Sequence, residues 1–362
     1  MRHVLRVGLA WGAKLADYSE FDRKNYFYPD LPKGYQISQY EFPLVSGGQL
    51  AGVAITRVHL EEDTASSMHD DATGATLIDY NRSGVPLMEL VTDPVITSAA
   101  QAGAFARELQ LLLRYLGASE ANMEKGEMRV EANISVSKTS AFGTKVEVKN
   151  LNSFRTMERA VVYEIERQIE LLENGGQVLQ ETRGWDEGKQ ATFAQRTKEG
   201  SADYRYFPDP DLPSLKISEI LEFATDTLQA SLPELPWVRR QRYIALGIKS
   251  EDADSYVRTV HLGDFFEAAI GAYPVGDPRI ILASNYIAND LVRIIRDHQG
   301  QDSELQHEIP ISAQNFKNII DMVGGGAISS RSAKDLIQLC ITEKKGPEEI
   351  AEEKNLLKTG VS

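Results

Sequence analysis

The sequence of 362 residues is poor in features that often define a protein class. It has one cysteine, Cys340, so neither an intrachain disulfide nor a zinc site made of cysteines alone can form. No apolar run approaches the roughly 18 residues that a membrane-spanning helix needs. The amino terminus, Met-Arg-His-Val-Leu-Arg, lacks the long apolar core of a signal peptide. These absences predict a protein of the reducing cytoplasm with no membrane partner.

Positive charge is also scarce. The chain has 39 lysines and arginines against 53 aspartates and glutamates, a net charge of -14. Proteins that bind nucleic acid over a general surface are usually basic, so this balance argues against such a protein and against DNA as a partner. Any RNA site must depend on shape, stacking and a few placed cations. With 42% hydrophobic and 25% charged residues, the composition is typical of a globular protein, and the length predicts two or three domains.

The hydrophobic pattern changes along the chain. Residues 128–136 and 145–149 alternate between apolar and polar, which predicts half-buried strands. Helical spacing predicts helices at 98–116 and 154–173, so this part is expected to be α+β with a mostly antiparallel sheet. After residue 217 only helices are predicted, at 217–230, 236–246, 250–259, 264–272 and 280–298, and then after Ser312, Ser330 and Pro347. The predicted domains are 1–229, 230–345 and 346–362.

A segment rich in aromatic residues and cations occupies residues 21–40. Such a mixture can stack on bases or on a nucleotide and can hold phosphates. The alternative is a proline-rich turn whose rings fill the core. The candidate binding residues are Lys24, Tyr26, Tyr28, Lys33 and Gln36.

Two acidic segments are candidates for a metal site. The string HLEED at 59–63 places adjacent carboxylates next to an imidazole, and Glu89 lies in the apolar stretch 85–91. Carboxylates suit Mg²⁺, which also binds waters and substrate phosphates. If a strand ends here, Glu61 and Glu62 point to opposite faces, so only one reaches a given site. The alternatives are a solvated acidic loop and an edge-strand glutamate that faces water.

Polar and basic residues mark two further segments. Arg129, Glu131 and Asn133 share one face of the predicted strand, with Lys149 downstream. The long polar stretch 181–213 includes Arg205 and could grip phosphates. A solvated sheet face and a structural loop are the alternatives. The sequence contains no Walker-type phosphate loop, nucleophile elbow, zinc-protease motif or dinucleotide fingerprint.

Five strings in this order resemble one known family. They are FDRKNYFYPDLPKGYQISQ (21–39), HLEED (59–63), NRSGVPLME (81–89), EVKNLNSF (147–154) and DYRYFPDPDLP (203–213). Together they resemble the B subunits of the aspartyl/glutamyl-tRNA(Asn/Gln) amidotransferases. The resemblance implies a glutamine-synthetase-like cradle domain, a helical domain and the start of a small helical tail that contacts tRNA.

The resemblance also implies a reaction. ATP would phosphorylate the side-chain carboxylate of Glu or Asp esterified to tRNA(Gln) or tRNA(Asn), with Mg²⁺, and ammonia would then displace the phosphate. The implied partners are the amidase (glutaminase) partner that releases ammonia from glutamine, a small third partner and the mischarged tRNA. Phosphoryl transfer depends on a metal and cations more than on a covalent nucleophile, which agrees with the absent nucleophile motifs. A non-catalytic tRNA-binding or assembly fragment and a stand-alone ligase remain alternatives.

The resemblance implies roles for particular residues. Glu62 and Glu89 match magnesium ligands, so their carboxylates are expected to lie close together. Glu131 is a further catalytic candidate, and Arg82, Lys149 and Arg205 are candidates for binding the nucleotide or the acyl phosphate. Family members also carry an amino-terminal segment with a Gly-Leu-Glu-Val-His strand, and a longer tail, that this sequence lacks. The chain is therefore expected to be truncated at both ends, and inactive alone.

Overall fold

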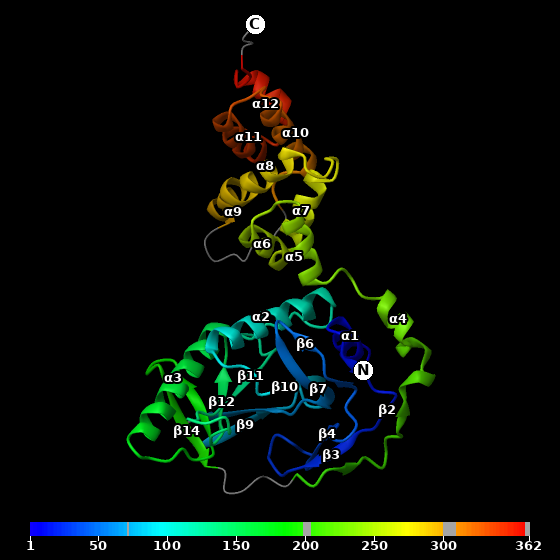
Figure 1. The fold of residues 1–362 in the computed structure, drawn as a ribbon, viewed down its shortest axis with the longest axis vertical. Coiled ribbons are helices and arrows are strands. Elements are labelled where there is room, and N and C mark those ends of the chain that lie inside the picture. Colours follow the sequence, from blue (N-terminus) through cyan, green and yellow to red (C-terminus); the bar gives the residue numbers. More distant parts are fainter. Residues whose placement is uncertain (71, 198–203, 300–308, 359–362) are drawn as a thin grey trace. The chain divides into compact units, whose positions relative to one another are not determined.

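The computed structural model describes residues 1–70, 72–197, 204–299 and 309–358, in two compact units. The first unit is Met1–Pro233 and the second is Glu234–Ser362. In the described ranges, the strands all belong to the first unit and the second unit consists of helices and their connections, as Figure 1 shows. The expected α+β class, with several antiparallel sheets before a helical carboxy-terminal region, is confirmed. No helix in the described ranges has the length and apolar character needed to cross a membrane.

The first sheet of unit 1 is antiparallel and carries helix α1 (Arg2–Ala10). Its order is β1 (Lys14–Leu15), β5 (Val45–Ser46), β7 (Val53–Glu62) and β10 (Pro86–Thr92), and β6 (Gln49–Leu50) also pairs with β7. Val4, Leu5 and Val7 of α1 are fully buried, as are Val45 and Val58 of the sheet. This packing supports β7 and β10, the two longest strands of the sheet.

Gly8 allows α1 to approach β5 closely. A Cβ atom added at Gly8 would lie 2.6 Å from both methyl carbons of Val45, in a core that cannot easily rearrange. We therefore expect Gly8→Ala to lower the free energy of unfolding by about 1–3 kcal/mol, the usual cost of overpacking. Urea titration measures this loss. The double variant Gly8→Ala/Val45→Ala removes the clash, so the two effects should not add; simple additivity would show that the close approach is unimportant.

The second sheet of unit 1 has the order β11 (Val130–Ile134), β12 (Val146–Leu151), β13 (Glu181–Asp186) and β14 (Ala191–Thr197). The predicted strands and helices are confirmed, the helices as α2 (Ala99–Tyr115) and α3 (Phe154–Glu173). Ser98 and Ser153 cap them, each accepting a backbone N–H of the first turn. Strands β12 and β13 are parallel because α3 connects them as a crossover. Helix α3 covers this sheet and packs against α2 (Figure 1).

Three small sheets complete the first unit. They are β3 (Asp22–Asn25) between β4 (Tyr35–Ser38) and β15 (Phe207–Pro208), the pair β2 (Tyr18–Ser19) and β16 (Leu215–Lys216), and the hairpin β8 (Ser66–Asp70) and β9 (Ala75–Asp79). The pairing of β15 with β3 sets Phe207 opposite Arg23, so it brings the first and fifth sequence strings side by side. Sequence periodicity does not predict this long-range contact.

The helices after residue 217 follow the predictions with four differences, the first being that the helix predicted at 264–272 spans Val260–Ile270. Residues 217–230 form η1 (Ile217–Glu219), η2 (Leu221–Phe223) and α4 (Thr225–Ala230), since Ile220 and Ala224 adopt extended conformations that interrupt a single helix. The predicted helix 280–298 contains a π-helical turn, and Ser329 rather than Ser330 caps the helix near 330. Unit 2 comprises α5 (Pro236–Ala245), α6 (Ser250–Arg258), α7 (Val260–Ile270), α8 (Pro278–Tyr286), η3 (Ile287–Leu291), α9 (Val292–Gln299), α10 (Ala313–Gly324), α11 (Ser330–Glu343) and α12 (Pro347–Glu353).

Candidate active site

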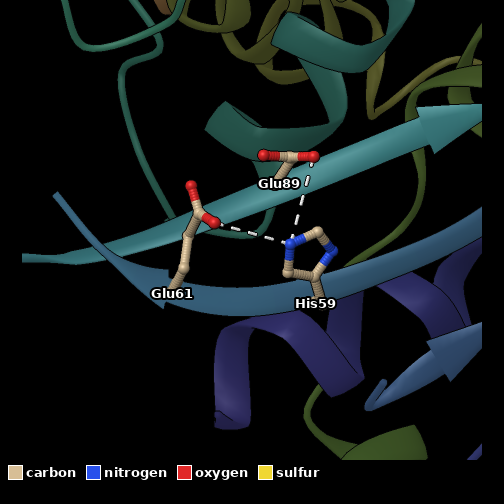
Figure 2. A group of neighbouring side chains, drawn as sticks. All are labelled: His59, Glu61 and Glu89. Carbon is tan, nitrogen blue, oxygen red and sulfur yellow. Dashed lines mark ion pairs between the residues drawn. The ribbon is translucent and has the colours of Figure 1, made fainter. Parts of the chain in front are cut away.

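Three ionisable side chains meet on one face of β7 and β10. The antiparallel register sets Glu89 directly opposite His59, and Glu61 follows two residues later on the same face as His59. His59 Nε2 lies 3.6 Å from Glu61 Oε2 and 4.0 Å from Glu89 Oε1, and Figure 2 shows the imidazole facing both carboxylates. One ligand atom from each residue lies within 4.8 Å of the other two, so the three could share one cation.

Burial disfavours the charged forms of the carboxylates in this triad, His59–Glu61–Glu89. His59 and Glu61 are only 3% and 6% exposed. Burial raises the pKa of the Glu89 carboxyl, and the charge of Glu61 raises it further. The charges of His59, Lys24 and Arg57 lower the pKa of Glu89, but burial and Glu61 outweigh them. His59 Nδ1 is buried and has no hydrogen-bond partner among the described residues, and Ser38 Oγ donates to Glu61 over 3.3 Å. Two neighbouring carboxylates of this kind are a donor set that a divalent cation stabilises.

Glu62 has a different environment from Glu61. Its carboxylate pairs with Lys33 and accepts the backbone N–H of Ile37 over 2.9 Å. Gln36 Nε2 donates to the Glu62 carbonyl oxygen over 2.7 Å. These contacts of Glu62 hold β4 against the end of β7. Strand alternation turns Glu61 toward Glu89 and Glu62 to the opposite face, so Glu61 joins Glu89 in this group. The predicted role of Glu62 as a metal ligand stays a prediction.

Aromatic side chains from the first and fifth strings gather beside the triad. The ring of Tyr26 contacts those of Tyr28 and Tyr204 edge to face, and Tyr206 stacks on Tyr40 at a centroid distance of 4.4 Å. Burial raises the pKa of Tyr206, and the charges of Glu61 and Glu89 raise it further. The pKa of Tyr26 is raised by burial and then by Glu61. Both phenols therefore stay protonated near the carboxylates.

Cations border these rings. Lys24 Nζ lies 5.1 Å from the ring centre of Tyr204, and Lys33 Nζ lies 4.7 Å from that of Tyr35. Tyr26 Oη donates to Gln36 Oε1 over 3.0 Å, so the predicted binding residues of this segment are neighbours. Tyr204 is 38% exposed and Tyr28 is 46% exposed, which leaves ring surface for a planar ligand.

Lys149 and Glu131 form an ion pair on the second sheet, with Lys149 Nζ 3.0 Å from Glu131 Oε1. A second carboxylate, Glu147, lies 3.9 Å from the same nitrogen. Burial of the Lys149 ammonium lowers its pKa, but these two carboxylates outweigh burial and raise it overall, with a smaller contribution from Tyr204. Lys149 is therefore a positively charged lysine near Tyr204 of the aromatic group.

The two predicted phosphate-binding arginines lie in loops. Arg82 Nη2 is 3.0 Å from Asp63 Oδ2 and donates to the Gly126 carbonyl oxygen over 2.9 Å. Arg205 has a left-handed backbone, φ 44°, and its carbonyl oxygen accepts Asn25 Nδ2 over 2.8 Å. Residues 198–203, which include the first residue of the fifth string, lie outside the described residues.

Sequence reasoning placed His59 and Glu61 in a candidate metal segment without selecting either one, and it missed Tyr204 and Tyr206 as site residues. All four residues lie inside the five strings named above. Composition therefore identified the segments but not the individual site residues. The missing information is the register of β7 against β10, which decides that Glu89 faces His59 and Glu61. Tyr204 and Tyr206 needed the pairing of β15 with β3.

Comparison with known proteins places the chain in a family. Residues 1–222 match the family described as "GatB/GatE catalytic domain", and residues 264–360 match "GatB domain". The chain is 40% identical over 376 residues to the B subunit of the aspartyl/glutamyl-tRNA(Asn/Gln) amidotransferase of Gloeothece citriformis, covering 98% of this chain and 74% of that protein. It is 42% identical over 371 residues to the protein of the same name from Burkholderia ambifaria, covering 97% and 74%. The chain therefore belongs to the family of B subunits of the tRNA-dependent aspartyl/glutamyl amidotransferases, and spans about three quarters of the length of these relatives.

Proposed function

We propose that this protein carries the ATP-dependent step of the amidotransferase. The γ-phosphoryl group passes from ATP to the side-chain carboxylate of Glu or Asp attached to tRNA, giving an acyl phosphate and ADP. Ammonia then attacks the acyl carbon, the carbon–nitrogen bond forms, the carbon–oxygen bond to phosphate breaks, and the amine loses a proton. The observation that carries the proposal is the triad of buried His59, buried Glu61 and half-buried Glu89, a candidate cation site beside aromatic rings and lysines.

The triad suits Mg²⁺. The Glu61 and Glu89 carboxylates offer the oxygen ligands that this ion prefers, and His59 Nε2 offers a third donor atom. When bound, the ion would supply positive charge for the phosphate oxygens of ATP. The raised pKa of the Glu89 carboxyl supports this fit, because burial and the Glu61 charge both disfavour its ionised form and a bound cation would favour it.

The surrounding residues would bind and orient the substrates. The rings of Tyr26, Tyr28 and Tyr204 offer stacking surfaces for the adenine of ATP or of the tRNA end. Lys24 and Lys33 would hold phosphates beside them, with Gln36 as a polar contact. We propose Lys149 and Arg205, with Arg82, for the nucleotide or the acyl phosphate, and Glu131 as the residue that positions Lys149.

The wider setting follows from the same proposal. The α+β unit would be a glutamine-synthetase-like cradle, and the helical region would contact tRNA. The amidase partner would release the ammonia, a small third partner would hold the two larger proteins together, and the assembly would work in the cytoplasm.

Dependence of ATP hydrolysis on charged tRNA tests the proposal. We expect the assembled complex to hydrolyse ATP when Glu-tRNA(Gln) or Asp-tRNA(Asn) is present and much more slowly with uncharged tRNA, because the phosphoryl acceptor is the aminoacyl carboxylate. Release of labelled phosphate measures the rate. Equal hydrolysis with charged and uncharged tRNA would contradict the proposal, and hydrolysis with a free acid alone would indicate a stand-alone ligase.

A further inference from the structure

We propose that Arg82 and Arg129 form a guanidinium clamp, held by Asp63, that binds phosphate oxygens of the nucleotide's polyphosphate. The inference rests on the proposed function and adds Arg129 and Asp63 to the site. It starts from one buried carboxylate that two arginines share.

Asp63 is the buried centre of this group. It follows β7 directly and is 5% exposed. Arg129 Nη2 donates to both of its carboxylate oxygens at 2.6 Å, and Arg82 Nη2 lies 3.0 Å from Oδ2. The Thr64 backbone N–H donates to Oδ1 over 2.9 Å, which fixes the carboxylate. Two arginines from separate segments of the chain are therefore oriented by a single anion.

Both guanidinium groups keep an outer surface. The side chains of Arg129 and Arg82 are 55% and 43% exposed. Among the described residues, Arg82 also donates to the Gly126 carbonyl oxygen, and Arg129 donates to Asp63. A guanidinium has five N–H donors, so these acceptors use only part of the donors of the two half-exposed side chains. Two planar donor groups that a protein carboxylate holds in place match the oxygens of a phosphate.

The charge balance favours an anion. One carboxylate faces two guanidinium groups, which leaves one positive charge in the clamp. The neighbouring Glu62 is neutralised by its ion pair with Lys33, so it does not cancel this positive charge. Holding two like charges on one buried anion costs repulsion that a bound phosphate relieves.

The position is right for a polyphosphate that also reaches the triad. Asp63 is two residues beyond Glu61, about 7 Å along an extended chain. Arg129 immediately precedes β11, on the polar face that continues through Glu131 to Lys149. A nucleotide whose phosphates meet the triad at one end can therefore meet the clamp at the other.

Binding of Mg-ATP to the assembled complex tests the clamp. We expect Arg129→Gln and Arg82→Gln each to raise the dissociation constant of Mg-ATP about 10- to 100-fold, the usual effect of losing hydrogen bonds to a charged group. Isothermal titration calorimetry measures the constant. Asp63→Ala should weaken binding similarly, and Asp63→Asn less, because asparagine keeps one acceptor oxygen. Arg107→Gln is the matched control, since Arg107 is 36% exposed and pairs with Glu158 between α2 and α3.

The affinity for Glu-tRNA(Gln), measured by gel shift, should change less than about twofold in the arginine variants. Unchanged ATP affinity would show that the ion pairs only fasten loops, and loss of tRNA affinity with normal ATP affinity would show a tRNA backbone contact; either result overturns the clamp. If Arg129→Gln fails to fold, Arg129→Lys replaces it, because lysine keeps the positive charge and loses the planar pair of donors. The clamp then predicts weaker binding of Mg-ATP by Arg129→Lys, and unchanged binding overturns it. A wild-type complex that binds no ATP would refute the proposed function itself.

Discussion

Replacement of Glu61 by glutamine is expected to slow amide formation on Glu-tRNA(Gln) about 10²–10³-fold. The magnitude is that of removing one preorganised electrostatic contact from a transition state. Glutamine keeps the size of the side chain and removes its charge, so the triad loses one of its two anionic oxygen donors. Single-turnover conversion of the charged tRNA by the assembled complex measures the rate.

Glu62→Gln is the matched control at the neighbouring position. It removes the charge that pairs with Lys33, whose side chain is 39% exposed, and keeps an acceptor oxygen for the Ile37 N–H. A partly exposed pair of this kind is worth about 1 kcal/mol. Its rate should therefore stay within about fivefold of wild type. Glutamine hydrolysis by the amidase partner should survive in both variants. A greater loss in Glu62→Gln than in Glu61→Gln would show that the wrong carboxylate has been assigned to the triad.

Replacement of Glu164 by alanine is expected to have the largest effect on stability. This carboxylate on α3 has 0% side-chain exposure and accepts hydrogen bonds from Arg167, Gln168 and Thr192 at 2.6–2.9 Å. Burial raises its pKa, but these donors, Arg167 first, lower it overall. Truncation leaves buried donors unpaired, so the free energy of unfolding should fall by about 3–5 kcal/mol. The melting temperature of the protein should drop by roughly 10 °C.

Glu166→Ala is the control on the same helix, because Glu166 is exposed. It should change the free energy of unfolding by less than about 0.5 kcal/mol. Because the pKa of Glu164 is lowered in the folded state, the network stabilises the fold above the ordinary carboxyl pKa. That contribution is lost as the pH falls through the lowered value. Equal melting temperatures for the Glu164 and Glu166 variants would show that the hydrogen bonds of Glu164 do not stabilise the fold.

Local patterns predicted much of the fold. Helix α3 has the predicted bounds, Phe154–Glu173, because its cap residue and the glycines after it act within a few residues. The strand at β11 followed from alternation. The expected helix at 217–230 was wrong as a single element, because apolar spacing does not show where Ile220 and Ala224 become extended. The parallel pairing of β12 with β13 and the pairing of β15 with β3 depend on tertiary contacts.

The site shows the same division. Composition selected the segments that carry Glu89, Tyr26, Lys149 and Arg82, and the structure brings those segments together. Strand alternation predicted that only one of Glu61 and Glu62 reaches the site. The choice between them needed the register of β7 with β10, which the sequence of either strand does not determine. Asp63 and Arg129 needed the approach of β11 to the end of β7.

The central claim is that His59, Glu61 and Glu89 hold a divalent cation, and Mn²⁺ binding followed by electron paramagnetic resonance tests it most directly. Mn²⁺ accepts the same oxygen and imidazole ligands and replaces Mg²⁺ in the measurement. The account predicts one Mn²⁺ bound per wild-type chain in the assembled complex, a similar affinity in Glu62→Gln, and at least tenfold weaker binding in Glu61→Gln and Glu89→Gln. Wild-type affinity in both Glu61→Gln and Glu89→Gln, or loss of binding in Glu62→Gln alone, would contradict it.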